Sequence, residues 1–138
     1  MVLLMIIGLA EPTWFMIRYH PFQNVYFNIL AGERSSLRQR FELDYWGLSY
    51  KQAIDAILTH DTRDQIKISV ANPPGFFYVN DGLPAALKRR IIKVRDPKEA
   101  DYFASNFRWH PDDYDLGEVF YTINVCSTKI MEVYKIKP

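Results

Sequence analysis

The chain lacks the residues and motifs on which most recognisable catalytic functions depend. Its 138 residues include one cysteine, Cys126, which excludes an internal disulfide bond and any metal site built from several cysteines. The sequence contains no dinucleotide-binding, P-loop, zinc-protease or nucleophile-elbow motif. We therefore assign no catalytic residue, no metal ligand and no cofactor from the sequence.

A marked excess of charge is missing as well. The chain has 17 lysines and arginines against 16 aspartates and glutamates, which gives a net charge of +1. No nucleic-acid partner is expected, because binding to phosphates requires a clustered excess of basic side chains. With 49% hydrophobic and 24% charged residues, the composition is that of one ordinary globular domain.

Long hydrophobic runs are also absent, except at the amino terminus. Residues 1–10 are apolar or Gly, Glu11 and Pro12 interrupt them, and residues 13–17 resume the apolar segment. A run of this length is too short to cross about 30 Å of hydrocarbon, which takes roughly 20 residues. The segment is either a buried or interfacial helix of this domain or the last turns of a membrane helix.

Aromatic residues next to a cation favour the second interpretation. Trp14 and Tyr19 lie near Arg18 in the sequence, and aromatic and basic side chains gather where a membrane helix meets the interface. We therefore predict an apolar lead over residues 1–17, interpreted as the end of a membrane helix, and a single α/β domain over residues 18–138.

Five strands are predicted, the first three of them parallel. The expected strands are residues 66–70, 91–94, 102–105, 119–125 and 130–136. Helical segments between the first three make them βαβ units, which pair in parallel. The last two follow each other across a short turn, which is typical of an antiparallel hairpin. The fold expected is α/β: a small mixed sheet with a parallel βαβ core and a C-terminal antiparallel hairpin.

A helix is predicted before the first strand. Residues 50, 53, 54, 57 and 58 are apolar at helical spacing, so a helix over about residues 50–59 should bury one face. Ser49 and Gln52 have the spacing of a capping box, in which each side chain satisfies a free backbone N–H group at the helix start.

An acid and two aromatic rings lie in the turn before this helix. Asp44 is expected to accept hydrogen bonds from backbone N–H groups of the turn, and the alternative is an acid/base role together with Glu42. Trp46 is expected to be buried, so that its removal would cost about 3–5 kcal/mol. Asp44, Tyr45 and Trp46 are also candidate binding residues.

Three consecutive aromatic residues follow the first predicted strand. Residues 72–75 (Asn-Pro-Pro-Gly) should end that strand in a loop, and this loop is unsuited to phosphate because proline donates no N–H. Phe76, Phe77 and Tyr78 are candidate contacts for a sugar ring or a partner. The alternative is that they fill space beside the sheet.

Two tetrapeptides share the order Arg, aromatic, His, Pro. They are residues 18–21 and residues 108–111, and their neighbouring residues do not align, so the likeness is interpreted as coincidence. If the two met in space, they would form a cationic site with aromatic walls, suited to a phosphate or sugar phosphate. The candidate binding residues in them are Arg18, His20, Arg108 and His110.

Longer segments resemble a family of membrane enzymes. Residues 20–28 (HPFQNVYFN) and 41–53 (FELDYWGLSYKQA) resemble the C-terminal part of bacterial membrane glycosyltransferases of the family 39, protein-mannosyltransferase-like group. Residues 100–108 (ADYFASNFR) are similar to a later strand of the same proteins. The resemblance spans about residues 14–138.

The resemblance implies a non-catalytic, extracytoplasmic C-terminal domain, and the chain would then be the terminal part of a longer glycosyltransferase. The family's acceptor-activating acids lie in a loop near the start of the membrane region, and nothing here matches that loop. The resemblance also implies a membrane-associated, periplasmic location, with the membrane portion of the parent glycosyltransferase and a sugar or polyprenyl-phosphate head group as partners. The alternative is a stand-alone soluble α/β protein that binds a small molecule or a partner.

Overall fold

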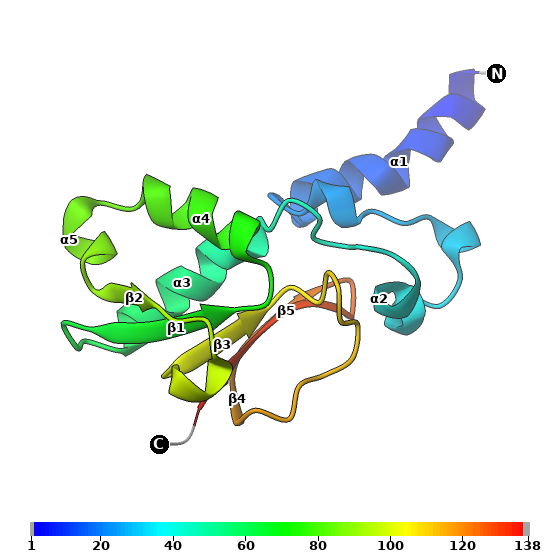
Figure 1. Ribbon diagram of the computed structural model, residues 1–138. Helices are drawn as coiled ribbons and strands as arrows, with labels where there is room; N and C mark the ends of the chain where they lie inside the picture. Colours follow the sequence, from blue (N-terminus) through cyan, green and yellow to red (C-terminus); the bar gives the residue numbers. More distant parts are fainter. Residues whose placement is uncertain (1, 137–138) are drawn as a thin grey trace.

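One sheet organises the part of the chain that the structure describes. The computed structural model describes residues 2–136, with the side chains of residue 5 and of residues 7–136. Residue 1 of the predicted apolar lead and residues 137–138 of the predicted domain lie outside the described residues. The strands lie in the order β2-β1-β3-β5-β4 (Figure 1). They are β1 (Ile66–Val70), β2 (Ile91–Lys93), β3 (Tyr102–Ser105), β4 (Glu118–Val125) and β5 (Thr128–Lys135).

The strand pairing confirms the predicted mixed sheet. β1 pairs in parallel with both β2 and β3, and β5 pairs antiparallel with both β3 and β4. The turn between β4 and β5 consists of Cys126 and Ser127, with φ angles of 47° and 66°. When both residues of a two-residue hairpin turn have positive φ, the twist of the turn matches the twist of the two strands that it joins. The fold is therefore α/β, with a parallel βαβ core and a C-terminal antiparallel hairpin.

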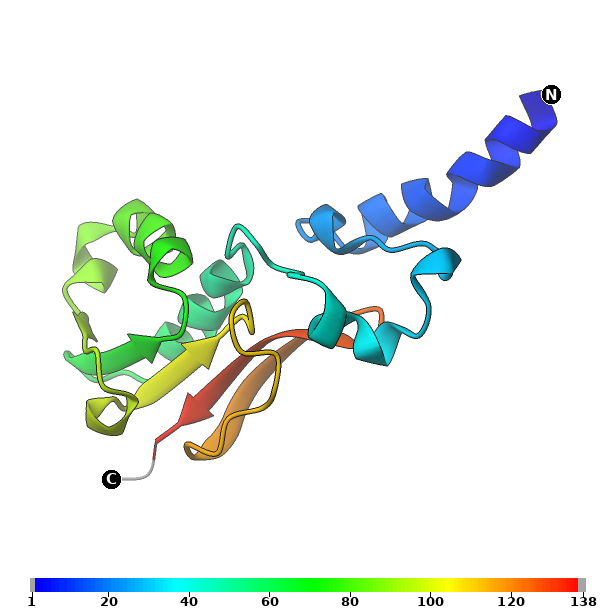
Figure 2. The same cartoon turned by 45° about the vertical axis from the view of Figure 1, so that its right-hand side comes forward.

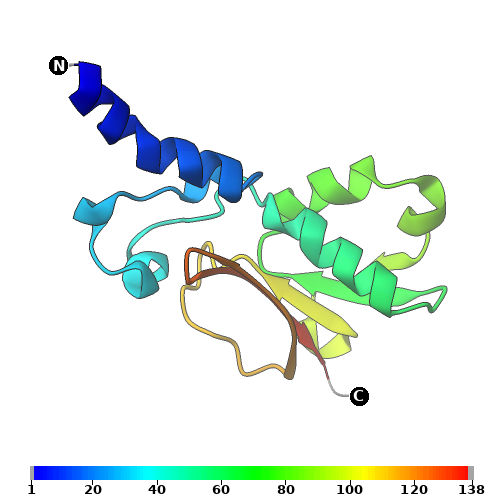
Figure 3. The same ribbon diagram turned by 180° about the vertical axis from the view of Figure 1, so that it is seen from behind.

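Helix α3 (Ser49–His60) builds the core together with the sheet. It lies across one face of the sheet (Figure 3), in contact with β5 and β4. The apolar positions predicted from helical spacing are all buried: Tyr50, Ala53, Ile54, Ile57 and Leu58. The guanidinium of Arg90 donates to the Leu58 carbonyl over 3.2 Å, so a cation caps the carboxyl end of this helix.

The connection from β1 to β2 contains two helices, α4 (Pro73–Gly82) and α5 (Ala85–Lys88). The loop predicted over residues 72–75 is wrong, because α4 begins at Pro73. Proline suits the first positions of a helix, where N–H groups have no intrahelical partner, so Pro73 and Pro74 start a helix here. Between β2 and β3 the chain forms one short 3₁₀ turn, η4 (Pro97–Glu99).

Short helical turns connect the amino-terminal helix to α3. They are η1 (Gln23–Val25), η2 (Ile29–Ala31), η3 (Arg34–Ser36) and α2 (Leu37–Arg40). α2 lies beside the long loop of residues 106–117 (Figure 2), and Arg38 forms an ion pair of 2.9 Å with Asp113 of that loop. The buried Leu37 attaches this connection to the core.

Helix α1 (Val2–Arg18) projects away from the rest of the protein, which we call the body (residues 19–136) (Figures 1–3). The helix continues through Glu11 and Pro12, where the sequence predicts an interruption. Phe15 is buried against the body, with its ring 4.8 Å from that of Tyr19. Among the described residues, no helix is both long enough and apolar enough to span a membrane.

Candidate functional site

The carboxyl ends of β1 and β3 form the edge of the sheet best placed to hold a ligand. β1 leads to β2 on one side, whereas the chain returns from β2 to β3 on the other side. In open α/β sheets, ligands bind at such a switch point, outside the carboxyl ends of the strands. Residues 43–48, 71–75 and 105–111 meet here, and we call the site that they form the carboxyl-edge site.

Asp44 holds the first of these segments together. One of its carboxylate oxygens accepts a hydrogen bond of 2.9 Å from the Leu48 N–H, and the other accepts from the Ser49 N–H over 3.2 Å and from the Ser49 hydroxyl. The side chain is buried, and burial raises the pKa of its carboxyl group. These bonds confirm the turn-forming role predicted for Asp44.

The predicted capping box is wrong in its details. Ser49 is the first residue of α3, and its hydroxyl donates to Asp44. The N–H groups at the helix start donate to the Asp44 carboxylate. In a capping box, the acceptor would be the Ser49 hydroxyl. A carboxylate five residues upstream can do this because the turn at Gly47 folds the chain back, and negative charge is favourable at a helix amino terminus.

Two glycines bring this turn close to α4. A Cβ atom on Gly47 would lie 2.7 Å from the Cα atom of Gly75, and the φ angle of Gly47 is 70°. The close approach and the left-handed backbone both require glycine at position 47. The contact fixes the turn that carries Tyr45 and Trp46 against the first turn of α4.

Two buried asparagines contribute polar groups to the same site. Asn106 Nδ2 donates to the Asp44 carbonyl over 2.9 Å, and the Asn72 N–H donates to the Tyr50 hydroxyl over 3.1 Å. Within the described residues, Asn106 Oδ1 and both polar atoms of the Asn72 side chain have no hydrogen-bond partner. An unpaired buried polar atom is costly, so these atoms are the ones that a water molecule or a small polar ligand would satisfy.

Exposed rings and a cation cover the outer side of the carboxyl-edge site. The Arg108 guanidinium lies 4.0 Å from the ring centroid of Tyr45 and 5.1 Å from that of Trp109. Trp46 makes an edge-to-face contact with Tyr45 at 4.9 Å. The expectation that Trp46 is buried is wrong, because its side chain is 69% exposed. In this turn Asp44 faces the core, and the indole points to solvent.

A small pocket lies beside these rings, and we call it the Arg108 pocket. It has a volume of about 230 Å³ and is lined by residues 38–42 together with Phe107, Arg108, Trp109 and Pro111. Its ionised lining residues are three arginines and Glu42, whose Oε2 lies 3.3 Å from Arg108 Nε. The arrangement of guanidinium groups and aromatic walls suits an anionic ligand.

The other tetrapeptide does not join this site. The Arg18 guanidinium lies 5.7 Å from the ring centroid of its neighbour Tyr19, and His20 Nδ1 lies 2.6 Å from Gln23 Nε2. The His110 ring packs 4.5 Å from the Tyr114 ring. Within the described residues, no hydrogen bond, ion pair or ring contact connects residues 18–21 with residues 108–111. The structure therefore does not assemble the site that would require both.

The three consecutive aromatic residues are divided between the core and the surface. Successive residues of a helix turn by about 100°, so neighbours cannot share one face. Phe76 is buried, Phe77 is half exposed with Lys93 Nζ 3.6 Å above its ring, and Tyr78 is exposed. They do not form one stacking surface for a sugar.

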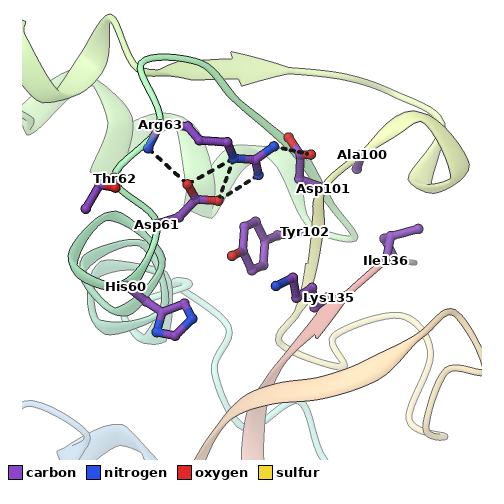
Figure 4. Close-up of a pocket in the computed structure, with 9 residues that line it drawn as sticks. All are labelled: His60, Asp61, Thr62, Arg63, Ala100, Asp101, Tyr102, Lys135 and Ile136. Atoms are coloured by element: carbon purple, nitrogen blue, oxygen red, sulfur yellow. Dashed lines mark hydrogen bonds and ion pairs between the residues drawn. The ribbon is translucent and has the colours of Figure 1, made fainter. Parts of the chain in front are cut away.

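A second hollow of about 460 Å³ lies at the opposite edge, where β1 and β3 begin (Figure 4). In it, Arg63 lies between two carboxylates: Nη2 is 2.6 Å from Asp61 Oδ2, and Nη1 is 2.9 Å from Asp101 Oδ1. Asp101 also accepts a hydrogen bond of 2.7 Å from the Lys67 N–H. The network ties the end of α3 to the starts of β1 and β3.

The electrostatics of this hollow indicate a structural role. The hydrogen bond from Arg63 lowers the pKa of Asp61 to about 2. Burial, and then the nearby Asp61 carboxylate, raises the pKa of Tyr102 to about 12. A carboxylate that stays ionised and a phenol that stays neutral are poorly suited to proton transfer near neutral pH.

In the acidic segment of residues 112–115, Asp113 is engaged in two ion pairs. Asp113 lies 2.9 Å from Arg38 and 3.0 Å from Lys129 Nζ. Among the described residues, no group of three or more His, Cys, Asp or Glu side chains is arranged to hold a metal ion.

Several residues of the carboxyl-edge site and of the adjoining Arg108 pocket are not identified from the sequence, namely Arg38, Arg40, Asn72, Asn106 and Trp109. A signal exists for the asparagines, because each closely follows a predicted parallel strand, where polar side chains converge on one edge. The two arginines of α2 have no such signal, since they meet residues 107–111 only through the tertiary fold.

Comparison with known proteins identifies no relative. No family model, no curated protein and no solved structure matches this chain.

Proposed function

We propose that this chain is a non-catalytic, extracytoplasmic domain of a membrane glycosyltransferase that uses a polyprenyl-phosphate-linked sugar, and that α1 attaches it to the membrane. The resemblance of residues 20–28 and 41–53 to that enzyme family supports the proposal from the sequence. The observation that carries it is the apolar surface of α1.

This apolar surface faces away from the body. Because each helical residue turns by about 100°, the exposed apolar residues of α1 span an arc of roughly 200°. Phe15, which is buried against the body, points opposite the middle of that arc, and Glu11 lies on the body side, 3.7 Å from Arg34. The residues of the arc are 50–77% exposed, and they are Met5, Ile7, Leu9, Trp14, Met16 and Ile17.

An arc of this width favours lipid over a partner helix. A partner helix covers a narrow stripe, whereas hydrocarbon contacts every outward side chain of a helix that lies in the interface. Trp14 and Tyr19, with ring centroids 6.0 Å apart, lie beside Arg18 at the end of α1. Aromatic and basic side chains of this kind favour the boundary between hydrocarbon and water.

With α1 in the membrane surface, the carboxyl-edge site of the body would lie close to the lipid head groups. The rings of this site and the guanidinium groups of the adjoining Arg108 pocket are the kinds of group that contact the faces of a sugar and the oxygens of a phosphate. The partners in this proposal are the membrane portion of the parent glycosyltransferase and the head group of its lipid-linked sugar.

Flotation of the full chain with phospholipid vesicles tests the membrane attachment. We expect the chain to float with vesicles and the double variant Leu9→Glu/Ile17→Glu to stay behind, because charges within the arc oppose insertion. The double variant Ser35→Glu/Thr59→Glu adds the same charge at exposed positions outside the arc and should float like the parent chain. If the parent chain stays behind, the membrane attachment is wrong, and a stand-alone soluble binding protein becomes the better description.

The non-catalytic assignment is tested with the purified chain and a polyprenyl-phosphate-linked sugar. We expect no transfer of the sugar to water or to an acceptor. Turnover that persists after removal of contaminating enzymes would overturn the assignment.

A further inference from the structure

We propose that the Arg108 pocket binds a phosphorylated sugar, with the phosphate on its arginines and the sugar ring on its exposed aromatic rings. The inference deepens the proposed function and rests on it only for the source of the ligand. The pocket is built by residues 38–42 and 107–111, and α1 contributes no residue to it.

The pocket has more guanidinium groups than carboxylates to neutralise them. Arg38 pairs with Asp113 at 2.9 Å, and Arg108 meets Glu42 at 3.3 Å. Arg40 donates to main-chain carbonyls, the shortest contact being 2.6 Å from Nη2 to the Ala31 oxygen. Guanidinium groups bind phosphate through paired hydrogen bonds, so an anion here would gain contacts that the protein itself does not supply.

Glu42 marks the place that we assign to the phosphate. Its carboxylate contacts the Arg108 guanidinium at the long distance of 3.3 Å and is 44% exposed, whereas the Arg108 side chain is 18% exposed. A long ion pair whose carboxylate is open to solvent contributes little to stability. A phosphate with more charge and more acceptor oxygens can therefore displace Glu42 from Arg108.

Arg38 is positioned before any ligand binds. Its side chain is 13% exposed, its guanidinium lies 4.2 Å from the Phe107 ring centroid, and its partner Asp113 is also held by Lys129 at 3.0 Å. Phe107 has a φ of 57°, and its N–H donates to the Ser105 hydroxyl over 3.0 Å. Such a conformation is costly for a bulky residue, and residues of this kind cluster at binding sites.

The exposed rings around the pocket suit a sugar. Trp109, Phe41 and Tyr45 are 62%, 42% and 46% exposed, and they flank Arg108 or line the pocket beside it. The faces of aromatic rings pack well against the C–H surface of a pyranose. The pocket volume of about 230 Å³ leaves room for a small ligand such as a phosphate that carries one sugar ring.

The test is a titration of the isotope-labelled full chain with glucose 1-phosphate, followed by NMR. We expect shifts in the amides of residues 38–42 and 107–111 and in the indole N–H of Trp109. Inorganic phosphate alone should shift the signals near the arginines at higher concentrations, and neutral glucose should bind more weakly than both. Shifts confined to other parts of the chain, or equal responses to glucose and glucose 1-phosphate, would overturn the proposal.

Variants separate the two halves of the ligand. Arg108→Gln should weaken both glucose 1-phosphate and inorganic phosphate by about tenfold, because it removes charge-assisted hydrogen bonds. Trp109→Ala should weaken glucose 1-phosphate only, and Glu42→Gln should strengthen both ligands because it removes the competing carboxylate. The control Arg89→Gln removes the same charge directly after α5, where Arg89 Nε donates to the Ala85 carbonyl over 3.3 Å, and it should leave both affinities unchanged.

The gain expected for Glu42→Gln keeps the test decisive, because a misfolded variant cannot bind more tightly. If Glu42→Gln binds no better than the parent chain and Arg108→Gln behaves like Arg89→Gln, the site assignment is wrong.

Vesicles distinguish the two sources of a phosphorylated ligand. Neutral vesicles are compared with and without a polyprenyl phosphate, using the parent chain, Arg108→Gln and Arg89→Gln. A gain in flotation that Arg108→Gln abolishes identifies a lipid-linked source, whereas binding of glucose 1-phosphate without that gain identifies a soluble one. Failure of α1 to bind neutral vesicles would contradict the proposed membrane attachment, and the glucose 1-phosphate titration would still decide the site.

Discussion

At the scale of single residues, two buried carboxylates respond in opposite ways to their surroundings. Asp44 meets neutral N–H and hydroxyl donors, and burial raises its pKa. Asp61 meets the guanidinium of Arg63, which lowers its pKa to about 2. A full positive charge outweighs the loss of hydration at Asp61, whereas neutral donors do not outweigh it at Asp44.

The lowered pKa of Asp61 predicts a loss of stability in acid. A shift from 3.8 to about 2 corresponds to about 2 kcal/mol, which we reduce to about 1 kcal/mol because Arg63 is 53% exposed. Since the folded-state pKa lies below the unfolded one, this stability is present above about pH 4 and is lost as the pH falls towards about 2.

The variant Asp61→Asn should lack this part of the pH dependence. Urea denaturation of both chains measures it, and the two free energies of unfolding should converge as the pH falls from about 5 to about 2. Asp44 acts in the opposite direction, so only the difference between the two chains isolates Asp61. A constant difference across that range would show that the ion pair does not depress the pKa of Asp61.

The roles of single residues could be predicted from the sequence only where they follow from local chemistry. An acid just before a helix start is a natural acceptor for free N–H groups, and Asp44 plays that part. The exposure of Trp46 could not be predicted, because the path of the turn decides which of three adjacent residues faces the core. That path depends on the contact between Gly47 and Gly75, which are far apart in the sequence.

At the scale of elements, the positions of the strands and of α3 follow from the local sequence of each element. Period-two and helical patterns set their positions, and β1 spans the same residues, 66–70, as the predicted strand. The sequence pattern does not identify α4, because the two prolines that are typical of the end of a strand also fit the start of a helix. The pairing of α2 with residues 106–117 could not be predicted, since it depends on the assembled sheet.

The turn before α3 allows a prediction about one element. Asp44→Ala should lower the free energy of unfolding by about 2 kcal/mol, because it leaves N–H groups at the start of α3 without their acceptor. Trp46→Ala should change it by less than about 0.5 kcal/mol, because that side chain is largely exposed. Urea denaturation measures both.

The matched control for Asp44→Ala is Asp55→Ala. Asp55 is an acid on the surface of α3 that pairs with Lys51, and its loss should cost less than about 0.5 kcal/mol. A larger loss for Trp46→Ala than for Asp44→Ala would show that the indole, rather than the carboxylate, holds the turn.

At the scale of the whole molecule, the two edges of the sheet and the surface of α1 carry different kinds of side chain. At the edge that contains Asp61 the charged side chains pair with one another, whereas the carboxyl-edge site has exposed aromatic rings beside the Arg108 guanidinium. The sequence singled out Tyr45, Trp46 and Arg108 at this site. It could not show that Arg38 and Arg40 lie beside Arg108, because that proximity arises only when α2 meets the loop after β3.

The division between α1 and the body predicts the outcome of two truncations. Deleting residues 1–11 should abolish flotation with vesicles and leave the thermal unfolding of the body unchanged. Among the described residues, this deletion removes half of the apolar arc and one exposed ion pair, between Glu11 and Arg34. Deleting residues 1–17 also removes Phe15, whose burial is worth about 3–5 kcal/mol, and should lower the unfolding temperature strongly.

The single variant Phe15→Ala separates the two effects, since it should destabilise the body and leave the arc intact. Circular dichroism follows unfolding, and flotation follows membrane binding. Phe15 is the only buried side chain among those that the structure describes in α1, so removal of residues 1–11 tests whether that part of the helix contributes to the stability of the body. Unfolding of the body after that shorter deletion would mean that the arc belongs to the core, and the membrane attachment proposed here would lose its main support.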